Sequence, residues 1–234
     1  MTRPRPAIWA ALALCLALAV FGAGSVSMQS SMGWDEAMHN AWPAARMRLA
    51  LGEGDFSSFF GAIHDCEQYP FIGPLWTAAV WSLTGISELA ARGGARVLWA
   101  IGLFGVFLLT RQVARGSRGE ALAPWIALAF AITSPLAVAF SGTLFLEIPS
   151  TVVLIFTLHA WLRRGEGGLR GELLAGTWIA LLFFTKFNYA LLTGAGFALD
   201  VLYQGLRAGR AGELRSFLRR TAALAALPLL AAAW

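Results

Sequence analysis

Long apolar runs, separated by short intervals that hold most of the arginines, are the feature of this sequence that most limits its possible folds. Only 13% of the residues are charged, about half the share of an ordinary soluble domain. Most runs approach the ~20 residues that a helix needs to cross a bilayer. We therefore expect an all-α protein, a polytopic transmembrane helical bundle of about seven spans. The runs are 7–24, 96–110, 121–141, 144–162, 173–185, 187–203 and 221–234.

The arginines predict how these spans are oriented. Arg3 and Arg5 precede the first run, and further arginines cluster within 111–118, 163–170 and 207–220. All of them fall on the cytoplasmic side, as the positive-inside rule requires, only if a further apolar segment at 71–90 does not cross the bilayer. The sequence thus predicts a multi-pass protein of the cell (inner) membrane with a cytoplasmic N-terminus. Residues 25–95 then form an extracytoplasmic loop that carries interfacial helices. This topology explains the net charge of +5 without a nucleic-acid partner.

The two ends of the chain raise separate questions. The first run also loosely resembles a secretory signal, with Ala23 near a cleavage-like stretch of small residues. It is longer than the usual apolar core of ~7–15 residues, which favours an uncleaved first helix. The chain stops at Trp234 inside an apolar run that is short for a span. We expect residues 1–234 to form a single module, truncated at its C-terminus.

The first loop carries a group of acidic residues that can do chemistry. Trp34-Asp35-Glu36 opens a predicted helix that runs to Leu51 and stops at Gly52. Asp35 and Glu36 occupy its first turn, where the helix dipole favours ionised carboxylates. Such carboxylates can accept a proton from a hydroxyl or hold a cation, and the alternative is a simple capping pair. His39 shares the helix face of Asp35.

Two further charged residues lie where spans meet the outer surface. Glu147 sits at the mouth of one span, and ionisable groups at such depths are functional candidates by default. Lys186 is the only lysine in the chain, and it can bind a phosphate or neutralise a nearby acid. The segment from His64 to Glu67 is rich in potential metal ligands but has no zinc-binding spacing. The sequence leaves metal dependence open, including the use of a divalent metal.

Taken in order, these stretches resemble the GT-C superfamily of integral membrane glycosyltransferases, in particular its protein mannosyltransferase and aminoarabinose transferase branch. The resemblance covers nearly the whole chain and lies in the order and topology of several short pieces. They are Trp34-Asp35-Glu36, Tyr69-Pro70, Arg96, Leu146-Glu147-Ile148-Pro149 and Thr185-Lys186.

The resemblance implies an enzyme that moves a sugar from a polyprenyl-phosphate carrier to a lipid, glycan or protein acceptor at the extracytoplasmic face. Asp35 would then be the base on the acceptor side, with Glu36 beside it and Glu147 as a third catalytic residue. Lys186 and Arg96 would bind the phosphate, and Tyr69 and His39 would contact the substrate. The implied partners are the lipid-linked donor, the acceptor and membrane lipids.

Two other classes of protein stay open. In a transporter or flippase-like protein, Glu147 and Lys186 would form a coupling or substrate-binding pair. No inverted repeat is visible, however, and the acidic residues gather at one face rather than at mid-membrane. A non-catalytic membrane scaffold is the reading to prefer if the acids of the first loop are solvated.

Overall fold

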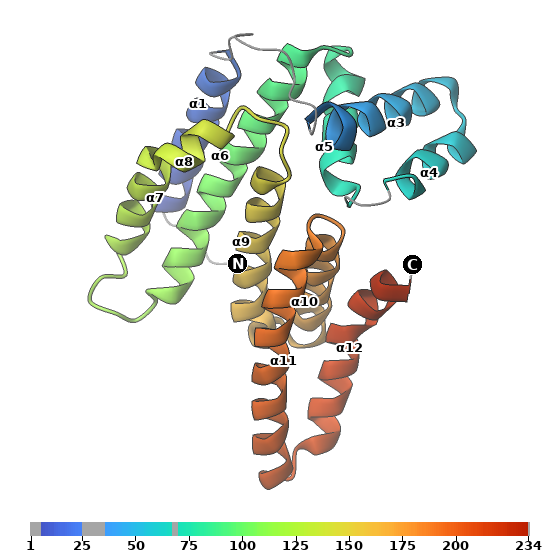
Figure 1. Ribbon diagram of the computed structural model, residues 1–234. Coiled ribbons are helices and arrows are strands. Elements are labelled where there is room, and N and C mark those ends of the chain that lie inside the picture. The colour runs from blue at the N-terminus through green and yellow to red at the C-terminus, as the bar shows by residue number, and fades with distance from the viewer. Residues whose placement is uncertain (1–5, 25–35, 67–69, 234) are drawn as a thin grey trace.

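The structure is a computed structural model that describes residues 6–24, 36–66 and 70–233, and every regular element within these ranges is helical (Figure 1). The expectation of an all-α protein is therefore confirmed for the described part of the chain. The elements are α1 (Pro6–Gly24), the π-helix η1 (Ala37–Ala41), α3 (Trp42–Glu53), α4 (Phe56–His64), α5 (Ile72–Thr84), α6 (Glu88–Val113), α7 (Ala123–Thr133), α8 (Pro135–Phe140), α9 (Glu147–Arg163), the 3-10 helix η2 (Arg164–Gly167), α10 (Gly168–Phe183), α11 (Phe187–Arg210) and α12 (Leu214–Ala233).

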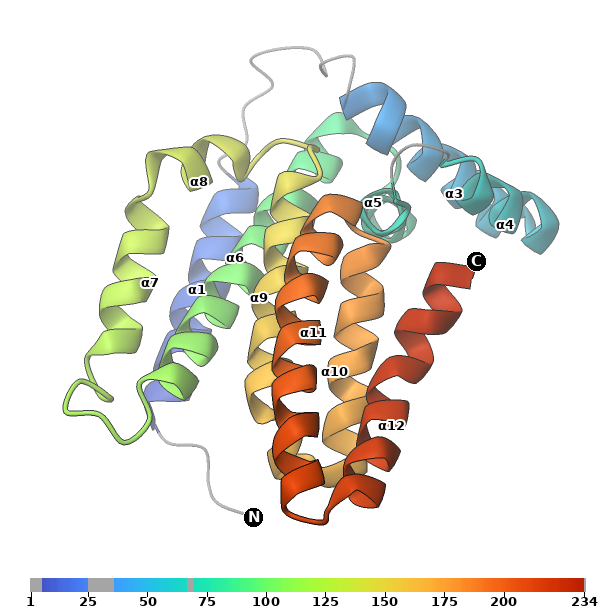
Figure 2. The ribbon, with the colours of Figure 1, turned by 60° about the horizontal axis from the view of Figure 1, so that its bottom comes forward.

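Helix α6 forms the centre of a helical bundle. It packs against α1 and α7 on one side and against α9 on the other, and α10 joins α9 to α11 and α12 (Figures 1 and 2). Glycines allow the α6–α9 contact to be close. A Cβ atom added at Gly102 would lie 2.8 Å from the Val152 side chain, and one at Gly105 would lie 2.9 Å from Ile155. Farther along the bundle, the rings of Trp161 and Phe197 stack with centroids 3.8 Å apart.

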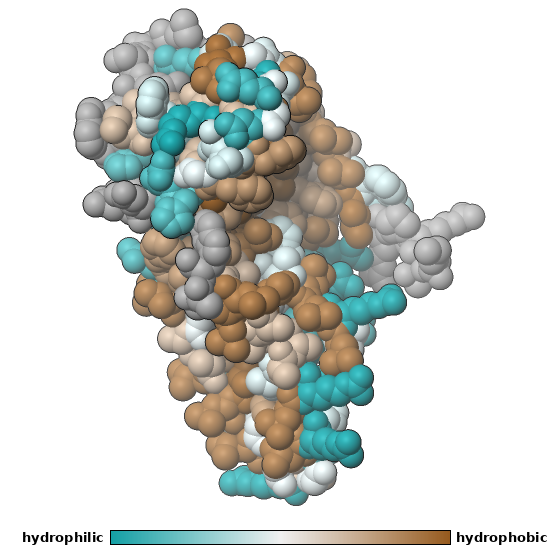
Figure 3. Space-filling view, turned by 90° about the vertical axis from the view of Figure 1, so that its right-hand side faces the viewer, coloured by the Kyte–Doolittle hydropathy of each residue, from teal (hydrophilic) through white to brown (hydrophobic). Residues whose placement is uncertain are grey.

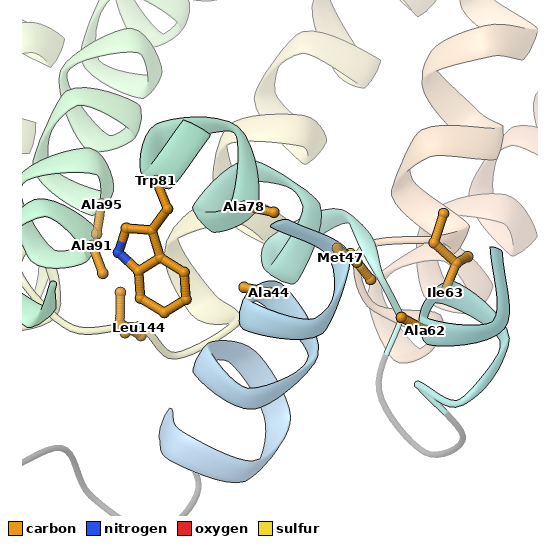
Figure 4. Packing of buried hydrophobic residues seen from close by; sticks show 9 residues of the cluster. All are labelled: Ala44, Met47, Ala62, Ile63, Ala78, Trp81, Ala91, Ala95 and Leu144. Carbon is orange, nitrogen blue, oxygen red and sulfur yellow. The ribbon is translucent and has the colours of Figure 1, made fainter. Parts of the chain in front are cut away.

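Helices α3, α4 and α5 form a separate arm at one end of the bundle. Figure 2 shows α5 nearly end-on while α6, α9 and α11 run lengthwise, so α5 lies across the bundle direction. A hydrophobic cluster joins the arm to the start of α6 (Figure 4). The cluster contains Ala44, Met47, Ala62, Ile63, Ala78, Trp81, Ala91, Ala95 and Leu144.

The surface of the bundle is strongly hydrophobic. Figure 3 shows hydrophobic side chains over most of its lower part, whereas hydrophilic ones gather on the α3–α4 arm. Among the described residues, α6 is the one helix that is both long and apolar enough to cross a membrane. Pro6–Phe21 and Ala123–Thr133 are shorter apolar helices. Helix length and composition thus identify one candidate span and do not support all seven that the sequence suggested.

The apolar run at 121–141, from which a single span was expected, forms two helices. Helix α7 ends at Thr133, and Ser134 is extended with φ −62° and ψ 115°. Proline disfavours helical geometry in the residue before it, so Pro135 explains the break. The Ser134 hydroxyl then accepts a hydrogen bond from the Ala137 amide and caps α8.

Three boundaries in the first loop also differ from the expectation. Gly52 lies within α3, and the helix instead ends at Glu53, followed by Gly54 as its C-terminal cap, whose φ of 70° favours glycine. Helix α5 ends at Thr84 rather than near residue 90. Helix α6 begins at Glu88, well before the expected start at residue 96, because the Ser87 hydroxyl caps the Ala90 amide. The second apolar run is therefore the continuation of a helix that starts inside the arm.

Candidate functional site

A pocket of about 450 Å³ opens where the arm meets the bundle. Its walls come from η1, the segment between α8 and α9, and the first residues of α9 and α11. Among the residues that the structure describes, one acidic residue, one lysine, one histidine and several phenylalanines face it. The lining residues are His39, Pro70, Phe140, Leu144, Phe145, Leu146, Glu147, Lys186, Phe187 and Asn188.

The charged groups of this pocket form an ion pair. Lys186 Nζ donates a hydrogen bond to Glu147 Oε1 over 2.7 Å, and 24% of the lysine and 42% of the glutamate side chain are exposed. The ammonium group also lies 5.0 Å from the centre of the Tyr189 ring. The structure therefore brings together two residues that are 39 positions apart and leaves both open to a ligand.

Two helix N-termini add to the positive field of the pocket. Glu147 is the first residue of α9, and Lys186 directly precedes α11. The unpaired backbone amides at such ends carry a partial positive charge and favour bound anions. The charges of Glu147 and Lys186 cancel, so the partial positive charges of the two helix ends make the pocket favourable for an anionic ligand.

A second pocket of about 300 Å³ adjoins the first, because Phe140 and Glu147 line both. It lies among α6, α7, α8 and α9 and reaches Tyr189 of α11. Most of its other lining residues are apolar, among them Trp99, Leu103, Val106, Ile148, Val152 and Ile155. Together the two pockets have an apolar end and a charged end, which suits an amphiphilic molecule.

The wall between the pocket and α6 is held by buried polar contacts. Glu36 is 5% exposed, and its Oε1 accepts a hydrogen bond of 2.7 Å from the Leu144 amide. Arg92 reaches both oxygens of Glu36, over 3.2 and 3.3 Å. It also donates to the Gly142 carbonyl over 3.0 Å and to Glu88 over 2.8 Å. The carboxylate of Glu36 is thus turned into the protein rather than toward the pocket.

The remaining predicted site residues are distributed as follows. His39 lines the pocket with Glu147 and Lys186. Arg96 packs on Gly142, where an added Cβ would lie 3.2 Å from its Nε, and it is not among the pocket's described lining residues. Asp35 and Tyr69 fall outside the described residues.

Arg92 and Asn40 contribute to the wall of the site although neither was predicted from the sequence. Asn40 Nδ2 donates a hydrogen bond of 2.9 Å to the Leu144 carbonyl, and its Oδ1 accepts one of 2.7 Å from the Thr77 hydroxyl. A signal for Arg92 was present, because an arginine just before an apolar run needs a partner when it is buried. Asn40 carried no such signal, since its buried position depends on the π-helix register of η1.

The segment near His64 does not assemble as a metal site within the described residues. Asp65 pairs with Arg46 over 2.8 Å, and the Cys66 thiol donates to the Ala62 carbonyl. Burial raises the pKa of Cys66 to about 11, so the group stays a thiol near neutral pH. Across residues 6–24, 36–66 and 70–233, no three His, Cys, Asp or Glu side chains converge as ligands.

Comparison with known proteins adds no relative to this geometry. No protein-family model, curated protein or solved structure matches the chain.

Proposed function

We propose that this protein is a polytopic membrane glycosyltransferase that moves a sugar from a polyprenyl-phosphate carrier to an acceptor at the extracytoplasmic face. The observation that carries the proposal is the joined pair of pockets, one apolar and one charged, that share Phe140 and Glu147. A polyprenyl phosphate has the same two-part character. The part of its tail next to the phosphate suits the apolar pocket, and its phosphate suits the end that holds Lys186 and two helix N-termini.

The charges of the site give each residue a role in this reaction. The acceptor hydroxyl attacks the anomeric carbon, the bond from that carbon to the phosphate oxygen breaks, and the carrier leaves as a phosphate. Lys186 stabilises the negative charge on the leaving phosphate. A carboxylate takes the proton of the hydroxyl, and Asp35 is the candidate that the family resemblance provides, while Glu147 is the carboxylate that lines the pocket.

The membrane assignment rests on composition and surface as well as on this site. The hydrophobic surface of the bundle and the mean hydropathy of +0.64 both suit a lipid environment. We propose that the bundle crosses the membrane several times, with the arm and the pocket at the extracytoplasmic face. The acceptor then reaches the pocket from the aqueous side and the carrier from the bilayer.

The test is transfer of radiolabelled sugar from a panel of polyprenyl-phosphate donors in membranes that contain the protein, normalised to folded protein. Asp35→Asn keeps the side-chain volume but removes the base, and its transfer should fall by roughly 10²–10⁴-fold. Arg118→Met removes an exposed cation outside the pocket and should leave transfer unchanged. Near-normal transfer by Asp35→Asn would remove Asp35 from the mechanism. If the protein instead carries a labelled amphiphile across a bilayer without transferring sugar, it is a transporter or flippase-like protein and not a glycosyltransferase.

A further inference from the structure

The backbone of Leu144 is held in an unusual way for a residue in an irregular segment. Its amide donates to Glu36 over 2.7 Å, and its carbonyl accepts from Asn40 over 2.9 Å. Both contacts come from side chains more than 100 positions away along the chain, and both are buried. The two peptide units that flank the Leu144 Cα atom are thus each fixed by a side chain from one of two neighbouring helical turns.

The side chain of Leu144 is anchored as firmly as its backbone. It is 4% exposed and belongs to the cluster that contains Trp81 and Ala91, as Figure 4 shows. Two residues earlier, Arg92 donates to the Gly142 carbonyl while it pairs with Glu36. The 141–146 segment is therefore bound at two carbonyls, one amide and one apolar side chain.

This segment forms a wall of the pocket and leads directly into Glu147. Leu144, Phe145 and Leu146 line the pocket, and Glu147 begins α9 immediately after them. A shift of the segment must therefore move the carboxylate that pairs with Lys186. Displacements of about 1 Å at a reacting centre can lower a rate on the order of 10²-fold.

We propose that Glu36, Asn40 and Arg92 form a clamp on the 141–146 segment, and that Glu36 is a positioning residue of the site and not its base. The inference rests on the proposed function for its effect on transfer, but the clamp itself has a separate readout. Asn40 is the informative member, because an amide side chain cannot serve as a general base. If the clamp positions the site, loss of Asn40 and loss of Glu36 must have similar consequences.

The primary measurement is hydrogen–deuterium exchange of the peptide that spans residues 141–147, in the protein reconstituted in lipid nanodiscs. Asn40→Leu and Glu36→Leu should each speed exchange in this peptide, by about two- to tenfold for each hydrogen bond lost. Thr77→Val keeps nearly the same volume but removes the hydroxyl that orients the Asn40 amide. It should give a smaller increase in a protein that folds normally. Glu53→Gln, an exposed acid of α3, is the matched control and should change nothing.

Transfer measurements then separate positioning from proton transfer. Glu36→Gln retains an oxygen that accepts from the Leu144 amide but cannot act as a base. The clamp predicts transfer within about tenfold of wild type and an unchanged pH–rate profile. A base would lose roughly 10²–10⁴-fold. Asn40→Leu should lose on the order of ten- to a hundredfold.

Each contrary outcome has a distinct meaning. Unchanged exchange at 141–147 in Asn40→Leu, Glu36→Leu and Thr77→Val would show that there is no clamp. A 10²-fold loss in Glu36→Gln with normal exchange would make Glu36 the base and overturn the inference. If wild-type protein transfers no sugar at all, the proposed function fails while the exchange data still support or refute the clamp.

Discussion

Substitutions of the two residues of the ion pair in the pocket should change the affinity for the carrier in opposite directions. In the free protein, Lys186 Nζ is held 2.7 Å from Glu147 Oε1. A phosphate that approaches Lys186 must therefore compete with the carboxylate for the same ammonium group, and it is also repelled by that carboxylate. Removing Glu147 and removing Lys186 consequently have opposite effects on affinity for an anionic headgroup.

The magnitudes follow from the geometry. Lys186→Met deletes one charge-assisted hydrogen bond to the phosphate, worth about 1.5–3 kcal/mol, so Kd should rise roughly 10- to 150-fold. Glu147→Gln releases Lys186 from a partly exposed pair, for which about 0.2–1 kcal/mol is typical. Carrier binding should tighten by up to about fivefold, while transfer falls because the carboxylate is lost.

The assay is equilibrium binding of a short-chain polyprenyl phosphate to the protein in nanodiscs of neutral lipid. Lys186→Arg keeps the charge and serves as the matched control, and the corresponding neutral polyprenol should bind all variants equally. Equal phosphate affinity in Lys186→Met and wild type would refute the placement of the phosphate. Weaker binding by Glu147→Gln would refute the competition argument.

Three other predictions concern topology, acid stability and packing. In a Cys-free background of intact cells, a single cysteine at Ser57 should react with an impermeant thiol reagent, and one at Gly116 should not unless the membrane is permeabilised. Hydrogen bonds from the Ser58 hydroxyl and amide lower the pKa of Asp55, which caps α4. The stabilisation that Asp55 provides is thus complete above its ordinary pKa of about 3.9 and is lost as pH falls through the lower folded value. The protection of the α4 amides, measured relative to the intrinsic exchange rate at each pH, should therefore fall in acid in wild type and not in Asp55→Asn. At Gly176 an added Cβ would lie 2.3 Å from a backbone oxygen of α12. Gly176→Ala should therefore destabilise the protein by about 1–3 kcal/mol and lower its Tm. Gly196→Ala is the control and should leave the Tm unchanged, because an added Cβ there meets open space.

The helices of this chain could be predicted from its sequence more readily than their ends could. The length of the apolar runs correctly indicated a helix over most of α1, α9 and α11. The break at Ser134 was missed because the run around it is uniformly apolar, although Pro135 was a local signal. The early start of α6 was missed because Arg92 and Glu88 look like loop residues until their partners are known.

The sequence indicated some of the residues that line the pocket, but it did not indicate the direction of the Glu36 side chain. Glu147 and Lys186 stand out as rare charges at the ends of apolar runs, and the structure places them in one pocket. Glu36 stood out equally, yet its carboxylate is directed at Arg92 and the Leu144 amide. Its direction depends on η1, where a π-helical turn shifts the side chains around the helix axis, and periodicity at 3.6 residues cannot show that shift.

Photolabelling with mapped sites tests the central claim most directly. A polyprenyl phosphate with a photoreactive group in its tail is bound to the reconstituted protein and irradiated. Mass spectrometry then identifies the residues that carry the label. The proposed function predicts adducts in the residues that line the apolar pocket, such as Leu103, Val106 and Ile155, with competition by unlabelled carrier and loss of labelling in Lys186→Met. Labelling confined to the exposed leucines of α11, such as Leu192 and Leu199, and unaffected by competitor would contradict it.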